Sequence, residues 1–118
     1  MPTDRPRSRR LRSDEKSIIA EMIRDLPPES AILRSLEDAA VEAMNDGGMG
    51  SLRFVRLSSD KPRFKRQIRE ATFADSNGVS VSMTINLDQD DCLFELDIFK
   101  ADFSPLKRFP ALGDISLR

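Results

Sequence analysis

The chain has 118 residues, 39% of them hydrophobic and 33% charged, with a formal net charge of -1, which suits one domain with a modest core. It contains no His, which excludes the commonest general base, the usual zinc, copper and iron ligand, and every Ser-His or Cys-His catalytic pair. Its single cysteine, Cys92, excludes an internal disulfide. No apolar run for a signal peptide or membrane span follows the basic N-terminus, so we expect a cytoplasmic protein without membrane contact. Since there is no His and no recognisable catalytic constellation, we expect no cofactor or metal and not an enzyme.

Residues 1–12 are rich in Arg, Pro and Ser, which predicts a disordered basic tail. A helix is expected from Ser13, a good N-cap, because Asp14 and Glu15 favour the positive end of the helix dipole. Pro27-Pro28 should end it. Apolar side chains at helical spacing define this helix and a second, shorter one: Ile18, Ile19, Met22, Ile23 and Leu26, then Ile32, Leu33 and Leu36.

Residues 45–54, "NDGGMGSLRF", hold three of the chain's five glycines. A phosphate-binding loop would need a following Gly-Lys-Ser/Thr and a helix N-terminus, and neither follows here. A hairpin with its loop at residues 45–50 instead places apolar side chains and opposite charges opposite each other, so we favour a turn over a nucleotide site. The expected pairs are Val41 with Phe54, Glu42 with Arg53, and Ala43 with Leu52.

Strict alternation over residues 79–87 predicts a strand with one buried face, and residues 94–98 follow the same pattern. A three-residue loop at 76–78 should join the first strand to an earlier one, and a two-residue turn at Asp90-Asp91 should join it to the later one. The expected neighbours are Phe73 and Val81, Ala71 and Met83, Ile85 and Leu96, and Leu87 and Phe94.

These elements predict an α+β fold, with two N-terminal helices packed on one face of a mainly antiparallel sheet of about five strands built from consecutive hairpins. Residues 13–110 should form the single domain and residues 111–118 a C-terminal tail. Two sheet edges would allow strand addition to a partner or a second copy, and hence a homo-oligomer. The predicted core comprises Ile19, Met22, Ile23, Leu33, Leu36, Phe54, Val81, Met83, Ile85, Phe94, Leu96 and Ile98.

Carboxylates gather at two places in this scheme. Glu70, Glu95 and Asp97 would share the polar sheet face, with Thr84 between the first and the last. Such a cluster can hold a divalent cation or supply an acid/base pair, but it is more often a solvated face. A second cluster, Asp88, Asp90 and Asp91, lacks the Gly and distant Glu of an EF-hand loop. We therefore predict no metal site.

The charges lie in blocks, and the most basic one spans residues 47–69. If it covers two neighbouring strands, its side chains form a positive patch able to contact nucleic-acid phosphates. The acidic chain and the missing aromatic-rich RNA-binding signature make this the alternative function rather than the first. The residues concerned are Arg53, Arg56, Arg63, Lys65, Arg66 and Arg69.

Ser104-Pro105-Leu106-Lys107 spells S-x-x-K, the nucleophile motif of penicillin-binding enzymes. The partner motifs are missing and the chain is too short for that fold. We expect Ser104 to cap a short helix in which Pro105 is the first residue.

The early helix, "NDGGMGSLRF" and "FELDIFKADFSPLKRFP" resemble a family of small uncharacterised bacterial proteins with a Gly-Gly-Met-Gly turn and a closing strand that ends in Asp-Phe-Ser-Pro-Leu. The likeness covers most of residues 13–110. It implies no assigned activity, and the family's size and style are similar to those of small immunity proteins. The pattern contains Asp46, Gly47, Gly48, Met49, Gly50, Asp97, Lys100, Asp102, Phe103, Ser104 and Pro105.

We therefore expect a non-enzymatic protein-binding module, immunity- or inhibitor-like, with nucleic-acid binding as the alternative. The absence of a catalytic constellation and the segregated charges favour another protein as the partner. The residues expected to contact it are Asp46, Met49, Glu70, Glu95, Asp97, Lys100 and Asp102.

Overall fold

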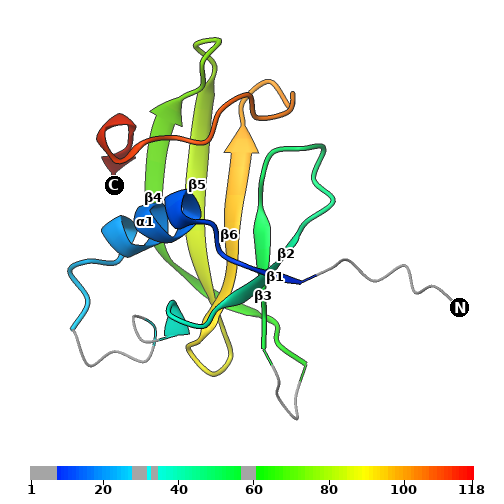
Figure 1. Cartoon of the computed structure of the whole chain (residues 1–118), viewed down its shortest axis with the longest axis vertical. Coiled ribbons are helices and arrows are strands. Elements are labelled where there is room, and N and C mark those ends of the chain that lie inside the picture. The colour runs from blue at the N-terminus through cyan, green and yellow to red at the C-terminus, as the bar shows by residue number, and fades with distance from the viewer. Residues whose placement is uncertain (1–7, 28–31, 33–34, 57–60) are drawn as a thin grey trace, which may run out of the picture.

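The structure is a computed structural model that describes residues 8–27, 32, 35–56 and 61–118. The described part is largely β, with seven strands in one antiparallel sheet and the helix α1 on one of its faces (Figure 1). In chain order the elements are β1 (Arg9–Arg10), α1 (Ser13–Met22), β2 (Ala40–Ala43), β3 (Leu52–Val55), β4 (Phe64–Ala74), β5 (Ser80–Asp88), β6 (Leu93–Lys100), the 3-10 helix η1 (Leu112–Asp114) and β7 (Ser116–Leu117).

The strand order is β1-β2-β3-β6-β5-β4-β7. The expected fold of two helices on a five-strand sheet made of consecutive hairpins is therefore wrong. Two additional strands come from segments predicted to be tails, since Arg9–Arg10 pairs with β2 and Ser116–Leu117 pairs with β4. The second predicted helix, with Leu33, lies largely outside the described residues.

Two of the three hairpins expected from the alternating pattern have the predicted register throughout. Val41 pairs with Phe54 across β2 and β3, so the glycine stretch is a hairpin loop. Phe73 pairs with Val81 across β4 and β5, as the three-residue loop requires. Period-two patterning thus located each local hairpin, because a one-residue slip would turn its apolar row toward water.

The pairing between distant segments differs from the prediction. β3 lies beside β6, with Arg53 opposite Glu95, and not beside its sequence neighbour β4. Pairing β3 with β4 would bring Arg53 and Arg56 close to the basic side chains of β4, and like charges on adjacent strands destabilise a sheet. The observed order separates the two basic strands by the acidic β6 and β5.

One predicted pair and the predicted two-residue turn at Asp90-Asp91 are wrong at the β5–β6 turn, because residues 89–92 separate the two strands and the Asp88 N–H donates to the Cys92 carbonyl at 2.9 Å. Ile85 pairs with Leu96 as expected, but Leu87 pairs with Leu93 because the register shifts at this point. Phe94 is the extra residue of this bulge. It is 7% exposed, yet it lies outside the main core cluster and against Arg53. The bulge therefore turns an apolar residue toward the polar face of the sheet.

α1 covers the apolar face of the sheet. Its N-cap is Arg12 rather than Ser13, and the Arg12 backbone N–H donates to Oε1 of Glu15 at 2.9 Å. Ile19 is fully buried, and every predicted core residue within the described part of the chain is buried. Segment 101–115 crosses the same face beside α1 without forming the helix expected at Ser104 (Figure 1).

Both sheet edges are strands of two residues, β1 and β7. β7 pairs only with Ala71 and Thr72 of β4, whose first half carries two register shifts. Short, charged and bulged edges are typical devices against strand addition, so the predicted homo-oligomer through an edge gains no support from this geometry. Within the described residues, no helix combines the length and apolar character needed to cross a membrane.

Candidate functional site: the open sheet face

The sheet face opposite α1 is the candidate site, and we call it the open face. Its side chains alternate along β3 to β6 with those of the core, and most are exposed or half-buried. The open face is formed by Arg53, Glu70, Thr72, Ser82, Thr84, Asn86, Phe94, Glu95, Asp97 and Phe99. It therefore holds Glu70, Glu95 and Asp97, the three predicted carboxylates.

The predicted cross-strand row is present. Thr84 pairs with Glu70 on one side and with Asp97 on the other, which places the two carboxylate-bearing strands about 10 Å apart. In the described part of the chain, neither Glu70 nor Asp97 forms an ion pair. No group of three or more His, Cys, Asp or Glu side chains there is arranged to hold a metal ion.

At the end of the open face near the β5–β6 turn, the charged side chains pair with one another. Arg53 donates to Glu95 at 3.1 Å, and Asn86 donates to the other oxygen of the same carboxylate at 3.1 Å. The Arg53 guanidinium carbon lies 4.5 Å from the centre of the Phe94 ring, within cation–π distance. An arginine is thus held between an aromatic face and a carboxylate of β6.

At the other end of β6, an aromatic side chain and a carboxylate lie on the open face, and no cation among the described residues pairs with that carboxylate. Phe99 is 44% exposed, and its ring meets that of Phe103 edge to face, with centroids 5.2 Å apart. Two residues earlier, burial raises the pKa of Asp97, and the negative charges of Glu95 and Asp46 raise it further. The hydroxyl of Ser51 opposes this shift through a 3.5 Å contact.

Phe103 has a left-handed backbone, with φ at 64°, although it is a bulky residue. Its N–H donates to the carbonyl of Lys100 at 2.9 Å, which closes a tight turn after β6. The carboxylate of Asp102 then accepts the N–H and hydroxyl of Ser104 at 3.0 and 2.6 Å. These contacts hold a ring that is 71% exposed.

Two residues predicted to contact a partner are internal. Lys100 is fully buried, and its ammonium donates to Asp75 at 2.7 Å and to the carbonyl of Pro105 at 3.1 Å. Met49 is 8% exposed, and its sulfur accepts the Lys100 N–H. Asp46 accepts the backbone N–H groups of Met49 and Ser51. It therefore shapes the hairpin loop at residues 45–50, which we call the glycine loop.

Asp75 is a buried hydrogen-bond acceptor whose role was not predicted from the sequence. Its carboxylate accepts the Lys100 ammonium and the backbone N–H groups of Ser76, Lys107 and Arg108. Burial alone would raise its pKa, but the Lys100 ammonium and these N–H groups outweigh burial and hold the pKa well below its usual range. The available signal was the position of Lys100, which continues the apolar positions Leu96 and Ile98 of the alternating strand.

The two stretches on which the family resemblance rests lie against each other. The Leu106 N–H donates to the carbonyl of Gly48 at 3.0 Å. A Cβ on Gly48 would lie 3.2 Å from that of Pro105, closer than ordinary contact, and one on Gly50 would touch Leu106 and Ile98. The glycine loop therefore makes a turn and also packs against the C-terminal segment, residues 101–115.

The six residues of the nucleic-acid alternative do not form one patch. Five of them form ion pairs: Arg53 with Glu95, Arg56 with Asp88 and Asp90, Lys65 and Arg66 with Asp91, and Arg69 with Asp25. Arg53 lies on β3 and Lys65, Arg66 and Arg69 lie on β4, whereas Arg56 and Arg63 lie outside the strands. The premise that this block spans two neighbouring strands is wrong, because β3 and β4 are not adjacent.

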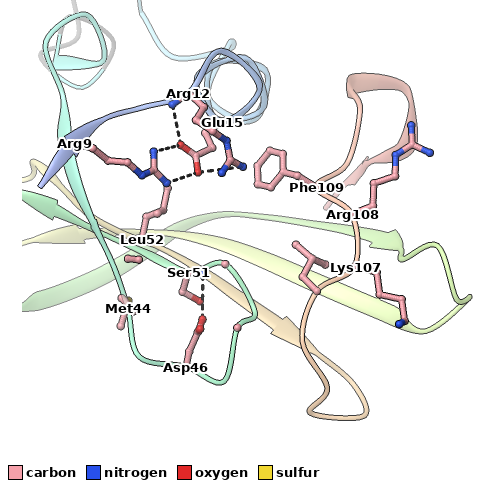
Figure 2. Close-up of a pocket in the computed structure, with 14 residues that line it drawn as sticks. Arg9, Arg12, Glu15, Met44, Asp46, Ser51, Leu52, Lys107, Arg108 and Phe109 are labelled. Atoms are coloured by element: carbon pink, nitrogen blue, oxygen red, sulfur yellow. Dashed lines mark hydrogen bonds and ion pairs between the residues drawn. The ribbon is translucent and has the colours of Figure 1, made fainter. Parts of the chain in front are cut away.

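A cavity of about 330 Å³ lies on the other side of the sheet, between α1, the glycine loop and residues 106–109 (Figure 2). Its most buried charge is Glu15, which receives both terminal nitrogens of Arg9, at 2.8 and 2.9 Å. Burial would raise the pKa of Glu15, but the hydrogen bonds from Arg9 and the Arg12 backbone lower it. Lys107 and Arg108 turn their side chains away from the cavity (Figure 2). Its two carboxylates already have donors, since Glu15 is paired with Arg9 and Asp46 accepts backbone N–H groups.

Because the pKa of Asp97 is raised, we predict that its ionised carboxylate destabilises the folded chain. A carboxyl group that holds its proton more strongly when folded loses stability as pH rises through its folded pKa. Asp97→Asn should therefore raise the free energy of unfolding at pH 7, and the gain should shrink below about pH 4, where the unfolded carboxyl is also protonated.

Urea denaturation at pH 7 and pH 3.5 measures both values. Asp102→Asn is the matched control: the pKa of Asp102 is lowered by its hydrogen bonds from Ser104, so that variant should gain nothing at pH 7. A loss of stability in Asp97→Asn at pH 7 would contradict the interpretation.

A domain-family model of unknown function, DUF6984, matches residues 8–110. Neither the curated proteins nor the solved structures gave a match. The matched range begins at the residue before β1 and ends at the buried Pro110, so it includes α1, β2 to β6 and the contact between the glycine loop and the C-terminal segment. The chain belongs to the DUF6984 family, a family of domains of unknown function.

Proposed function

We propose that this domain is a protein-binding module whose open face receives a basic segment of another protein. The observation that carries the proposal is the pair Glu70 and Asp97, which lie on one sheet face without an ion pair while most carboxylates elsewhere in the described chain have one. A cationic partner would supply the missing charge, and complementary charge favours both encounter and register.

The exposed apolar area supports a protein as the partner. Phe99 and Phe103 together offer exposed aromatic surface, and Phe99 lies two residues from Asp97 on the same strand. Aromatic residues are enriched where proteins bind one another. Nucleic acid is less well supported, because it needs unpaired cations and this face carries unpaired acids. An inhibitor- or immunity-like role would be one form of such a module.

Site-directed photocrosslinking tests the proposal. A benzoylphenylalanine at Ser82, in the middle of the open face, should give a protein adduct in an extract of the organism that encodes the chain. The same probe at Arg24, which follows α1 and is exposed, is the matched control and should not. The double charge reversal Glu70→Lys/Asp97→Lys should abolish the Ser82 adduct, because it places repulsive charge against a basic partner.

Three outcomes would contradict the proposal. One is an adduct from Arg24 but not from Ser82. Another is an adduct that survives the charge reversal, since the partner would then not be held by charge. The third is an adduct that contains only a second copy of the chain, which would make this face a dimer interface.

A further inference from the structure

We propose that the open face binds the side chain of a partner arginine, which stacks on the aromatic pair Phe99–Phe103 and forms an ion pair with Asp97. This inference rests on the proposed function, because it names the chemical group that the basic partner would insert.

The chain itself contains the arrangement that the proposal requires. At the β5–β6 turn end of the open face, Arg53 stacks on Phe94 and pairs with Glu95, and the exposed fraction of Phe94 is only 7%. At the opposite end, Phe99 and Asp97 repeat the aromatic ring and the carboxylate on the same strand and face. No described Lys or Arg forms an ion pair with this second carboxylate. The partner's guanidinium would take the position that Arg53 takes beside Phe94.

The geometry of the aromatic pair suits a planar cation. The rings of Phe99 and Phe103 meet at 82°, so one ring presents its edge to the other and a ring face is left for a ligand. Ring faces carry the negative part of the aromatic quadrupole, and guanidinium stacks on them more often than ammonium does. Along a strand, side chains two residues apart on one face are about 7 Å apart, so Phe99 and Asp97 are both within reach of one arginine.

The backbone of Phe103 is a separate observation in favour of a ligand. A bulky residue in the left-handed region is strained, and such strain persists only where the surroundings impose it. Here the Lys100 carbonyl and the Asp102–Ser104 contacts impose it, yet the ring that they position is 71% exposed and gains little from burial. A position that strains the backbone to display an aromatic ring is well explained by a ligand that covers it.

Fluorescence anisotropy with a defined peptide tests the inference. The probe is fluorescein-labelled Gly-Val-Arg-Val-Arg-Val-Gly amide, in which both arginines lie on one side of an extended chain. The matched probe carries citrulline, which is planar but uncharged, in place of both arginines. We expect the arginine peptide to bind at least about tenfold more tightly than the citrulline peptide at 50 mM salt.

Two substitutions locate the site. Phe103→Gly removes the ring at a position where glycine adopts the same backbone without strain, so the fold should be kept while binding weakens about tenfold. Asp97→Asn should weaken binding about fivefold, as loss of one charge-assisted contact. Leu112→Ala, on η1 and 50% exposed, is the matched control for removal of an exposed apolar side chain and should change affinity less than about twofold.

Equal affinity for both peptides, no binding of the arginine peptide up to 1 mM, or full affinity in Phe103→Gly would each overturn the inference. These results are distinct from a failure of the proposed function. A charge-sensitive Ser82 adduct that persists in Phe103→Gly would leave the binding module standing without its arginine anchor. Absence of that adduct in the parent chain would remove the binding module itself.

Discussion

Lys100→Met should lower the free energy of unfolding by about 3 to 5 kcal/mol, the largest single effect that we expect. The substitution keeps most of the side-chain volume but leaves the carboxylate of Asp75 buried without its ammonium partner. It also removes the 3.1 Å hydrogen bond to the Pro105 carbonyl, which helps to hold the C-terminal segment. Urea denaturation at pH 7 measures the change.

Lys107→Met is the matched control, because the Lys107 side chain is exposed and only its backbone N–H contacts Asp75. It should change stability by less than about 0.5 kcal/mol. The double variant Asp75→Asn/Lys100→Met should lose less unfolding free energy than the two single variants lose in sum. Each single variant leaves one buried group of the ion pair without its partner. A cost below about 1 kcal/mol for Lys100→Met would contradict a buried, paired lysine.

The same ion pair sets a pH dependence. The folded pKa of Asp75 lies below its unfolded value, so the stability that it contributes is present above about pH 4 and is lost as pH falls toward the folded value. The parent chain should therefore lose stability in acid more steeply than Asp75→Asn.

Gly48→Val should lower the free energy of unfolding by about 2 to 5 kcal/mol, the second largest effect. The left-handed backbone, with φ at 82°, costs a branched residue about 1 to 2 kcal/mol. The added Cβ would also lie 3.2 Å from that of Pro105, and overpacking of this kind costs about 1 to 3 kcal/mol more. Thermal or urea denaturation gives the value.

Gly47→Val separates the two causes. Gly47 has nearly the same backbone, with φ at 77°, but a Cβ there would have no neighbour within 4 Å. It should cost only the backbone part, about 1 to 2 kcal/mol. Equal losses of unfolding free energy in the two variants would mean that Gly48 is needed for the turn alone and not for packing against Pro105 and Leu106.

The sequence predicted the structure where the information is local. The register of Val41 with Phe54 and of Phe73 with Val81 follows from alternation and loop length, because only one register buries both apolar rows. The start of α1 likewise follows from helical spacing, but the helix ends at Met22 and not at Pro27-Pro28 as predicted. Its N-cap was misplaced by one residue, since Ser13 is a good cap by type but Glu15 bonds to the Arg12 N–H.

The non-local pairing could not be read in the same way. Nothing in the period of β3 distinguishes β4 from β6 as its neighbour, and the consecutive arrangement is the common one. The charge blocks held the missing signal, because Arg53 finds Glu95 on β6 and would have met like charges on β4. β1 and β7 are too short to show any alternation.

The candidate site was predicted in part. The row Glu70, Thr84 and Asp97 follows from the hairpin registers, and it is present. The role of Lys100 was missed, although its place two residues after Ile98 puts it on the apolar side of β6. Its partner Asp75 is 25 residues away, and no local pattern links the two. The exposed pair Phe99–Phe103 depends on the left-handed turn at Phe103, which side-chain type argues against.

Backbone NMR of the isotope-labelled chain during titration with the arginine peptide shows whether the open face is the binding surface. We expect the largest amide shifts on Ser82, Asp97, Phe99 and Phe103, with α1 unaffected. Largest shifts on α1, or at the cavity beside Arg9 and Glu15, would contradict it.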